Sequence, residues 1–329
     1  YAYASQGYTY SSVKQFLFGG FDDNGSTVMD DFKLSGYETT VFTGYNLKEE
    51  PFGKYLTGDY IFDTRKDMKR ESHQHTTPSR RVVKAFDNFL NNRDNSKPFF
   101  SFFFLTDPHF PYKQVNTPVL CDKYIATRDI KPKNRELVER SYYDQVWHVD
   151  KAAGGIMDSL EAHNIKNNTT IIFIGDHGES LYDDGITIGH GLEINDVMTH
   201  TAMVVVNPLI DFPDVLSHMH LRKLLHNVIS ADKTLEHVAK LLPLTDRKLF
   251  QYTGSLRYPR EIGLFSVDDG RVVYKIQEDE LTASKIEDGD TEDITSLRNN
   301  KYEKQIINKW EYTLFKDSKY DSMVPAKNL

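Results

Sequence analysis

The sequence predicts an α/β protein with a mainly parallel central sheet flanked by helices. Two observations predict this class. Short apolar runs alternate with amphipathic stretches over the first two-thirds of the chain, and several runs are almost continuously apolar, as in strands buried on both faces. In addition, polar candidate ligands follow two of these runs directly, and the carboxyl ends of the strands are where such sheets place their ligand sites.

Four runs predict strands of this sheet. Residues 38–42 are rich in β-branched side chains, residues 99–105 are nearly all apolar, and residues 169–174 and 202–206 repeat that pattern. Apolar side chains recur at helical spacing between the runs, over residues 82–90 and 142–160. Strands that alternate with helices imply βαβ units, and therefore parallel strands.

The pattern changes near residue 245. Residues 262–267 and 271–277 alternate apolar and polar side chains, and the Asp-Asp-Gly between them predicts a hairpin. A final amphipathic helix is expected over residues 301–315. We therefore expect a main domain over residues 1–245 and a small C-terminal α+β subdomain over residues 246–329, packed against it.

Composition limits the classes of partner. The chain has 329 residues and a net charge of −8, which argues against nucleic-acid binding because that function needs a basic face. The single cysteine, Cys121, excludes an intramolecular disulfide. No run approaches the apolar length of a membrane-spanning helix. The chain begins with Tyr1 rather than Met, so we expect a fragment or a processed chain, with a targeting or anchoring segment upstream.

The most informative segment is the apolar run that ends at Asp176-His177, with a glycine on each side of the pair. Carboxylate and imidazole groups are ligands for Zn²⁺, Mn²⁺ or Mg²⁺. We expect the pair to bind a metal ion, Glu179 to orient His177, and the glycines to let an ion approach the backbone. His190, in a Gly-His-Gly loop, is a third candidate. The alternative is a polar turn in which Asp176 caps a following helix.

Two further segments contribute candidates. His109 follows residues 99–105 on a turn that two prolines brace, which suits a positioned imidazole. Thr9 precedes a helical stretch over residues 13–18. A hydroxyl at a helix start either caps the helix or acts as a nucleophile that metal coordination ionises.

Six segments, in order, resemble the sulfatase-like branch of the alkaline phosphatase superfamily, which includes arylsulfatases, phosphoethanolamine transferases and lipoteichoic acid synthases. Chance similarity in one segment would be unremarkable, but six in the family's order are specific. The similar segments are the nucleophile segment at residues 3–19, Gly-Tyr-x-Thr with Gly-x-x-Leu at 36–47, Pro-His-x-Pro-Tyr at 108–112, a long helix at 143–160, the Asp-His strand at 168–179, and Gly-His-Gly at 189–191.

The resemblance implies a role for each candidate residue. It implies that Thr9 is both nucleophile and metal ligand, and that Asp176 and His177 bind the same ion. His109 and His190 would hold the transferred group or a second ion. The residues expected to support them are Glu179, Tyr45 and Asn46. The implied cofactor is a divalent metal, Zn²⁺ or Mn²⁺ ahead of Mg²⁺ or Ca²⁺.

Three departures from the family pattern refine this expectation. Sulfatases of the family oxidise a Cys or Ser within Cys/Ser-x-Pro/Ala-x-Arg to formylglycine, whereas this chain has Thr9 and, in place of the Arg, Val13. This difference disfavours the sulfatase route and favours phosphotransfer. Tyr45 replaces a Lys that relatives carry. The family's first strand, with an acidic metal ligand, would lie before Tyr1.

Three functions are therefore predicted as alternatives. The first is a metal-dependent phosphotransferase or phosphoester hydrolase that forms a phospho-threonine on Thr9 and acts on phospholipid-like or surface-glycan esters. The second is a sulfatase-type hydrolase of sulfate esters. The third is a catalytically degenerate ectodomain that binds lipid or regulates a partner. The resemblance also implies an extracytoplasmic location, periplasmic or at the cell surface, with a membrane anchor upstream of Tyr1.

Overall fold

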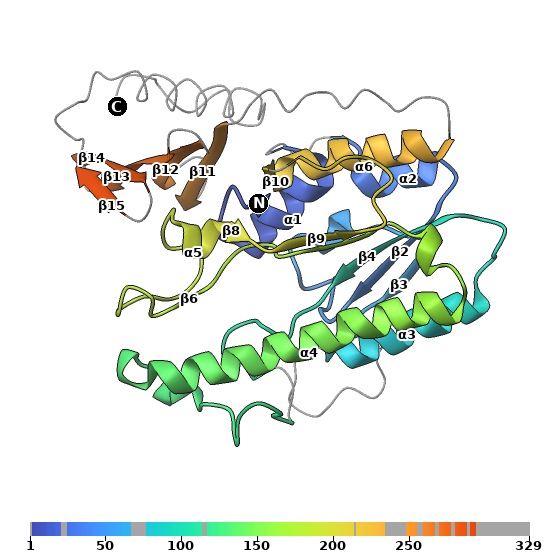
Figure 1. Ribbon diagram of the computed structural model, residues 1–329, viewed down its shortest axis with the longest axis horizontal. Helices are drawn as coiled ribbons and strands as arrows, with labels where there is room; N and C mark the ends of the chain where they lie inside the picture. Colours follow the sequence, from blue (N-terminus) through green and yellow to red (C-terminus); the bar gives the residue numbers. More distant parts are fainter. Residues whose placement is uncertain are drawn as a thin grey trace.

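The computed structural model has helices on both faces of a central sheet (Figure 1). The expected helix over residues 301–315 lies outside the part of the chain that it describes. The described residues are 2–20, 25–66, 77–113, 117–213, 215–233, 248–254, 259–266, 270–277, 280–287 and 290–293.

Three strands form the parallel part of the sheet. β2 (Glu38–Thr43) lies between β3 (Tyr60–Phe62) and β4 (Phe99–Phe104) and pairs in parallel with both. The side chains of β2 are largely β-branched, which suits a pleated strand covered on both faces. The strands expected near residues 38–42 and 99–105 are confirmed.

Residues 202–206 do form a strand, but its direction differs from the expectation. β9 (Met203–Val206) pairs antiparallel with β5 (Ile171–Ile174). A parallel crossover usually needs a full helix between the two strands, and α5 (Asp196–Thr199) has only four residues. The α/β class is confirmed, but residues 202–206 add an antiparallel strand where a further parallel one was expected.

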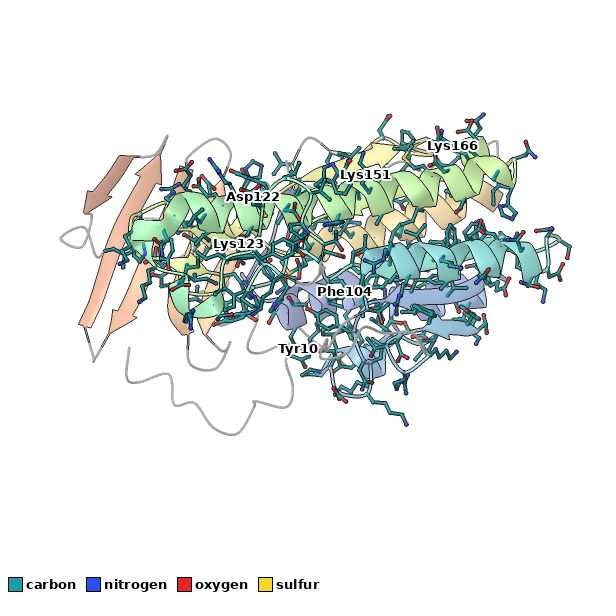
Figure 2. The ribbon with its side chains drawn as sticks, turned by 90° about the horizontal axis from the view of Figure 1, so that it is seen from below. Tyr10, Phe104, Asp122, Lys123, Lys151 and Lys166 are labelled. Atoms are coloured by element: carbon teal, nitrogen blue, oxygen red, sulfur yellow. The ribbon has the colours of Figure 1, made fainter. Side chains whose placement is uncertain are left out.

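Helices cover both faces of the sheet (Figure 1). On one face α1 (Thr9–Phe18) packs against α2 (Val28–Leu34) and α6 (His218–Lys233), and on the other α3 (Ser79–Asn92) packs against α4 (Arg135–Ala162). Seen from below, α3 and α4 lie lengthwise, and Lys151 marks the exposed face of α4 (Figure 2). None of the helices in the described chain combines the length and apolarity needed to cross a membrane.

Successive side chains of β2 supply the two halves of the core. Val41 belongs to the apolar cluster beneath α1, α2 and α6, whereas Phe42 belongs to the cluster beneath α3 and α4. This division follows from the two-residue period of a strand, which turns neighbouring side chains to opposite faces. Both side chains are completely buried.

The long helix α4 departs from its predicted apolar stripe at one end. Ile156 and Leu160 are buried as expected, but Val146 is 39% exposed and Asp144 is fully buried. The Asp144 carboxylate accepts hydrogen bonds from Val119 N and from Tyr124 OH, both at 2.6 Å. The first half of α4 therefore turns a polar face toward the loop that precedes it, which apolar periodicity alone does not predict.

A five-stranded antiparallel meander follows the main sheet at one end of the molecule (Figure 1). The pairing of its second and third strands confirms the expected hairpin. Its first strand contacts the segment before α1, because Tyr252 N donates to Ser5 O at 3.0 Å and Gln251 Nε2 donates to Ala4 O at 3.1 Å. The domain boundary at residue 245 remains a prediction. The strands are β11 (Lys248–Gly254), β12 (Pro259–Ser266), β13 (Gly270–Gln277), β14 (Glu280–Glu287) and β15 (Asp290–Asp293).

We predict that Phe42→Ala lowers the free energy of unfolding by about 3–5 kcal/mol, as expected when a buried aromatic ring is removed. The ring of Phe42 contacts those of Phe86 and Phe103, so its removal leaves a cavity. Leu34→Ala, at a position of α2 that is 86% exposed, is the control and should change stability by at most about 0.5 kcal/mol. Denaturant unfolding followed by circular dichroism measures both. Equal losses in the two variants would contradict the core position of Phe42.

Candidate active site

The candidate site forms where three chain segments run side by side. β1 (Ala2–Tyr3) pairs antiparallel with β8 (His200–Thr201) and parallel with β10 (Leu216–Ser217). The segment after β5 lies on the other side of β8, because Gly175 N donates to Ala202 O at 3.0 Å and Gly178 N donates to Met198 O at 2.9 Å. Residues 198–202 therefore hold the start of α1 and the end of β5 against each other.

Two glycines permit this close approach. A Cβ on Gly178 would overlap the carbonyl of Val197, and a Cβ on Gly175 would lie 3.3 Å from the Cβ of Thr201. The sequence suggested that these glycines admit an ion to the backbone. In the structure they admit the neighbouring segment, which places the Asp-His pair beside the start of α1.

Thr9 faces this pair. It is the first residue of α1, Tyr8 occupies the N-cap position, and the Thr9 hydroxyl does not cap the helix. Instead Thr9 Oγ1 lies 3.1 Å from His177 Nε2, and Asp176 Oδ2 lies 3.4 Å from the same nitrogen. A hydroxyl, a carboxylate and an imidazole therefore converge at the positive end of a helix dipole.

The alternative role of Asp176, as a helix cap, is not what the structure shows. The chain continues from Asp176 into the short strand β6 (Ser180–Leu181), not into a helix. Asp176 Oδ1 accepts a hydrogen bond from His177 N at 3.1 Å, which fixes the carboxylate beside the imidazole.

Three histidines present the same ring nitrogen for ligand binding. In each, Nδ1 contacts an oxygen that only accepts, so Nδ1 carries the hydrogen and Nε2 of the neutral ring keeps a lone pair. Metal-binding histidines are commonly fixed in this way. The Nδ1 contacts are His177 with Gly178 O at 2.8 Å, His109 with Phe110 O at 2.6 Å, and His190 with Glu179 Oε2 at 2.6 Å.

The three imidazole rings also lie close together. The ring centroids of His177 and His190 are 4.1 Å apart, and those of His109 and His190 are 5.8 Å apart. His109 is exposed, whereas the side chain of His177 is only 8% exposed. The structure thus brings together Thr9 with Asp176 and His177, and places the two further histidines beside them.

The expectation for Glu179 needs a correction. Glu179 orients His190, not His177, because its Oε2 accepts from His190 Nδ1 and its Oε1 accepts from Tyr112 OH at 2.5 Å. Ligand atoms of His177, Glu179 and His190 lie within 4.8 Å of one another. Both oxygens of Glu179 are already acceptors, however, so we assign it to support and not to metal ligation.

The charge of Glu179 also changes the acidity of His190. Burial lowers the pKa of His190, but the hydrogen bond and charge of Glu179, helped by the charge of Asp176, outweigh burial and leave that pKa above its ordinary value. His190 therefore holds a proton more readily than an unperturbed histidine does.

Tyr45 and Asn46 follow β2. Tyr45 lies close enough to Asp176 to feel the charge of its carboxylate, whereas the contacts of Asn46 are within its own loop. The ring of Tyr45 stacks on Phe104, with centroids 5.3 Å apart. Burial raises the pKa of Tyr45, and so does the nearby charge of Asp176, so the phenol is neutral. Asn46 orders its own loop instead, because its Nδ2 donates to Glu49 Oε1 at 2.6 Å and its Oδ1 accepts from Lys48 N at 3.2 Å.

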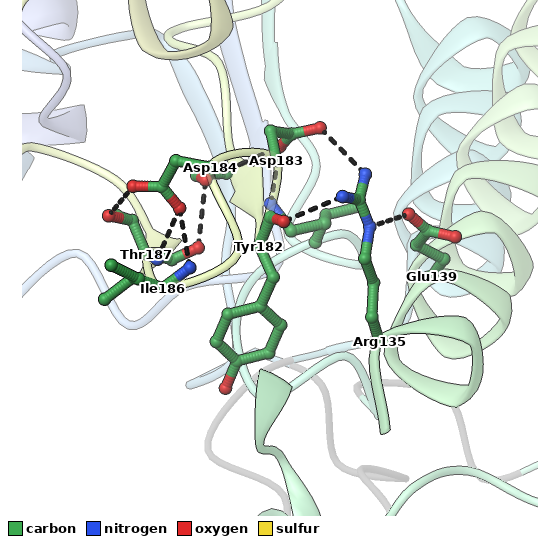
Figure 3. A network of polar contacts seen from close by, with 9 residues as sticks. Arg135, Glu139, Tyr182, Asp183, Asp184, Ile186 and Thr187 are labelled. Carbon is green, nitrogen blue, oxygen red and sulfur yellow. Dashed lines mark hydrogen bonds and ion pairs between the residues drawn. The ribbon is translucent and has the colours of Figure 1, made fainter. Parts of the chain in front are cut away.

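The hairpin over residues 180–189, which separates Glu179 from His190, is fastened to α4 (Figure 3). Arg135 donates to Tyr182 O at 2.8 Å and to Asp183 Oδ1 at 3.2 Å. Asp184 Oδ1 accepts from two backbone amides inside the turn, at 2.9 and 2.7 Å. These contacts fix the turn of the hairpin that leads to His190.

Sequence reasoning missed His218, the first residue of α6. Its side chain is buried and lies beside Gly175 O, Asp176 and His177. Burial lowers the pKa of His218 to about 4; Asp176 opposes this shift and His177 reinforces it. His218 directly follows a strand, which is the position that drew attention to the other candidate ligands. That strand, β10, has only two residues and is too short to detect from sequence.

The donor set fits a divalent metal ion. The site offers two oxygen ligands, from the Thr9 hydroxyl and the Asp176 carboxylate, and one nitrogen ligand, His177 Nε2, which keeps its lone pair. Mixed oxygen and nitrogen ligands suit Zn²⁺ and Mn²⁺. Thr9, Asp176 and His177 would hold such an ion, with His190 next to them.

An α/β fold with a helix-start hydroxyl beside a strand-end Asp-His pair is the arrangement of the alkaline phosphatase superfamily. Residues 2–244 match the family model described as Sulfatase. The chain therefore belongs to the sulfatase family, and the resemblance seen in its sequence is confirmed.

Similar proteins include both sulfatases and phosphotransferases. An endo-4-O-sulfatase from Bacteroides thetaiotaomicron is 32% identical over 164 residues, which are 43% of this chain and 32% of that protein. The phosphoethanolamine transferase EptA from Salmonella typhimurium is 29% identical over 82 residues, 24% of this chain and 15% of that protein. These alignments span a third or less of the relatives' own length.

A solved structure supports the fold over the whole chain. The lipoteichoic acid synthase LtaP from Listeria monocytogenes superposes with a TM-score of 0.66 at 12% identity, covering 99% of this chain and 84% of that one. At this identity the likeness shows the shared α/β architecture alone.

We predict that His218→Gln makes the protein less sensitive to acid. Between pH 6.5 and about 4 the unfolded chain takes up a proton at this position and the folded chain does not, so stability falls as the pH falls through this window. The loss from this group is on the order of 3 kcal/mol. Glutamine keeps a donor for Gly175 O and cannot take up the proton.

The measurement is Tm as a function of pH. Lys223→Gln, at an exposed position of the same helix, is the control and should keep the slope of the parent protein, because lysine side chains carry the same charge throughout this window. A slope in His218→Gln equal to that of the parent would contradict the buried, neutral state of His218.

Proposed function

We propose that this protein transfers or hydrolyses phosphate esters by a metal-dependent mechanism in which Thr9 is the nucleophile. The observation that carries the proposal is the 3.1 Å contact between Thr9 Oγ1 and His177 Nε2, with Asp176 beside them. A serine or threonine hydroxyl is a weak nucleophile until a base or a metal ion activates it. The contact supports activation by an ion, because Thr9, Asp176 and His177 can bind one together and its charge would let the hydroxyl release its proton.

The chain's own residues account for the steps of the reaction. Thr9 Oγ1 gives up its proton to water and attacks phosphorus, forming an O–P bond as the bond to the leaving oxygen breaks. The phosphoryl group stays on Thr9 until water or an acceptor hydroxyl displaces it and the threonine hydroxyl is restored. A bound divalent ion supplies positive charge that favours the ionised hydroxyl.

The surroundings of Thr9 oppose the negative charge that develops. The N-terminal end of α1 points its positive dipole toward the group in transfer. His190 can hold a proton at Nε2, since its Nδ1 is engaged and its pKa is raised. That proton can neutralise the departing oxygen.

The substrate class and the cell compartment follow from the same relatives. EptA and LtaP support phosphate esters carried on phospholipid head groups or surface glycans. For such substrates we propose an extracytoplasmic location, periplasmic or at the cell surface, with a membrane anchor upstream of Tyr1. The ion we propose is Zn²⁺ or Mn²⁺, ahead of Mg²⁺ or Ca²⁺, because imidazole joins the oxygen ligands.

Hydrolysis of sulfate esters is the second candidate, and the 32% identity to an endo-4-O-sulfatase favours it. The residues near Thr9 count against the usual sulfatase route. Val13 takes the place of the arginine in the formylglycine motif, and it is packed in the core at 4% exposure. This position therefore offers no charge to a sulfate group.

We predict that Thr9→Val lowers the turnover of bis-p-nitrophenyl phosphate by at least about a thousandfold, whereas Thr9→Ser keeps measurable activity. Valine keeps the branched shape and lacks the nucleophilic oxygen. Ser11→Ala, which removes a neighbouring hydroxyl of α1, should stay near the parent rate. The assay is run beside p-nitrophenyl sulfate.

The pattern of results separates the candidate functions. Phosphodiester turnover that survives Thr9→Val would refute the nucleophile. Turnover of the sulfate ester alone would favour the sulfatase reaction. A parent protein that binds metal and hydrolyses neither ester would favour the lipid-binding or regulatory ectodomain.

We predict that removal of metal by a chelator abolishes phosphodiester turnover and that Zn²⁺ or Mn²⁺ restores it. Asp176→Asn should weaken Zn²⁺ binding by at least about tenfold, since even partners of metal ligands contribute that much. Asp150→Asn, on the exposed face of α4 with 73% of its side chain accessible, is the matched control. Calorimetric titration measures both affinities, and equal affinities would contradict the ligand role of Asp176.

A further inference from the structure

We propose that Tyr112 is a positioning residue whose hydroxyl fixes Glu179 and, through Glu179, the orientation of His190. Its effect on turnover rests on the proposed function, whereas its effect on His190 can be measured without any substrate. Tyr112 does not touch the groups that would react. It acts through a chain of two hydrogen bonds that ends at His190.

The first step of the argument is the geometry of the two bonds. Tyr112 OH donates to Glu179 Oε1 at 2.5 Å, and His190 Nδ1 donates to Glu179 Oε2 at 2.6 Å. Each carboxylate oxygen therefore serves one donor. Both contacts are short, as is usual when one partner is ionised.

The second step is burial. Tyr112 is completely buried, and the side chains of Glu179 and His190 are 9% and 18% exposed. Water cannot readily replace a lost partner in such a place, so removal of the Tyr112 hydroxyl leaves a buried carboxylate oxygen without its donor. Glu179 must then turn to find another donor, and His190 loses its fixed orientation.

The third step is the position of the Tyr112 ring. Tyr112 lies in an apolar cluster that joins the His109 turn, the hairpin over residues 180–189 and α4. Its φ angle is +59°, unfavourable for a residue with a Cβ, so the packing around it must hold it in place. The cluster members buried with it are Ile125, Val138, Leu181 and Tyr182.

These contacts make Tyr112 a link between two histidines. Its backbone N donates to His109 O at 3.0 Å, and its hydroxyl reaches His190 through Glu179. The ring centroids of His109 and His190 are 5.8 Å apart. Tyr112 thus joins the turn of His109, through its backbone, to Glu179 and His190, through its side chain.

The test compares Tyr112→Phe with Tyr142→Phe. Both variants keep an aromatic ring, and the ring of Tyr142 packs edge-on against that of Tyr112 with centroids 5.5 Å apart. Tyr112→Phe should lower kcat about 10- to 100-fold, with little change in KM. Tyr142→Phe should stay near the parent protein. Equal losses in the two variants would assign the effect to packing and overturn the proposal.

A double-mutant cycle tests the path through Glu179. If both residues act on His190 along one path, Tyr112→Phe combined with Glu179→Gln should lower kcat no more than Glu179→Gln alone. Effects that multiply would mean that Tyr112 acts elsewhere, and would overturn the proposal.

The readout without substrate is the imidazole N–H resonance of His190 in protein with ¹⁵N-labelled histidine, assigned by its loss in His190→Asn. The parent protein and Tyr142→Phe should show this proton protected from exchange, and Tyr112→Phe should not. A resonance unchanged in Tyr112→Phe would overturn the proposal. If the parent protein hydrolyses no ester, the proposed function fails and this measurement still decides the role of Tyr112.

Discussion

Carbonyls of residues 198–202 accept hydrogen bonds from the two segments that flank them, and the geometry of the candidate site depends on these contacts. Thr199 O accepts from Ala4 N at 2.8 Å on one side, whereas Met198 O accepts from Gly178 N at 2.9 Å on the other. The end of α5 and the residues that follow it thus hold the approach to α1 and the end of β5 against one shared segment. Thr9 and His177 meet for this reason, although they are 168 residues apart in sequence.

The histidines of the site differ in how many tertiary contacts fix the orientation of each imidazole ring. His177 and His109 direct Nδ1 to the carbonyl of the next residue, so each keeps its orientation wherever its own turn forms. His190 depends on Glu179, on Tyr112 and on a hairpin fastened to α4. The C-terminal meander adds support beyond that hairpin, because Glu261 Oε2 accepts from Ile194 N at 2.7 Å. Disturbance of tertiary packing should therefore affect His190 before the other two.

This difference also explains how much of the site the sequence predicts. Asp176, His177 and His109 follow apolar runs, and such runs are the sequence signal for buried strands. Glu179 was expected to orient its near neighbour in sequence, but the hairpin that begins directly after it returns His190 to its side chain. His218 follows a strand of only two residues, which leaves no periodic signal. The strands were predicted well, whereas the antiparallel direction of β9 depended on a connection whose course the sequence does not reveal.

The balance of charge around Thr9 ties the proposed substrate to the proposed metal. An anionic ester that reaches Thr9 must also approach the Asp176 carboxylate, which lies beside the same His177 nitrogen. Two like charges about 4 Å apart repel by about 4 kcal/mol at an effective dielectric constant near 20. Tyr45, at this edge of the sheet, is a neutral phenol and offsets none of that charge. A divalent ion held by Asp176 would turn the repulsion into attraction, so under the proposed function the ion is needed to bind the ester before it is needed to activate the hydroxyl.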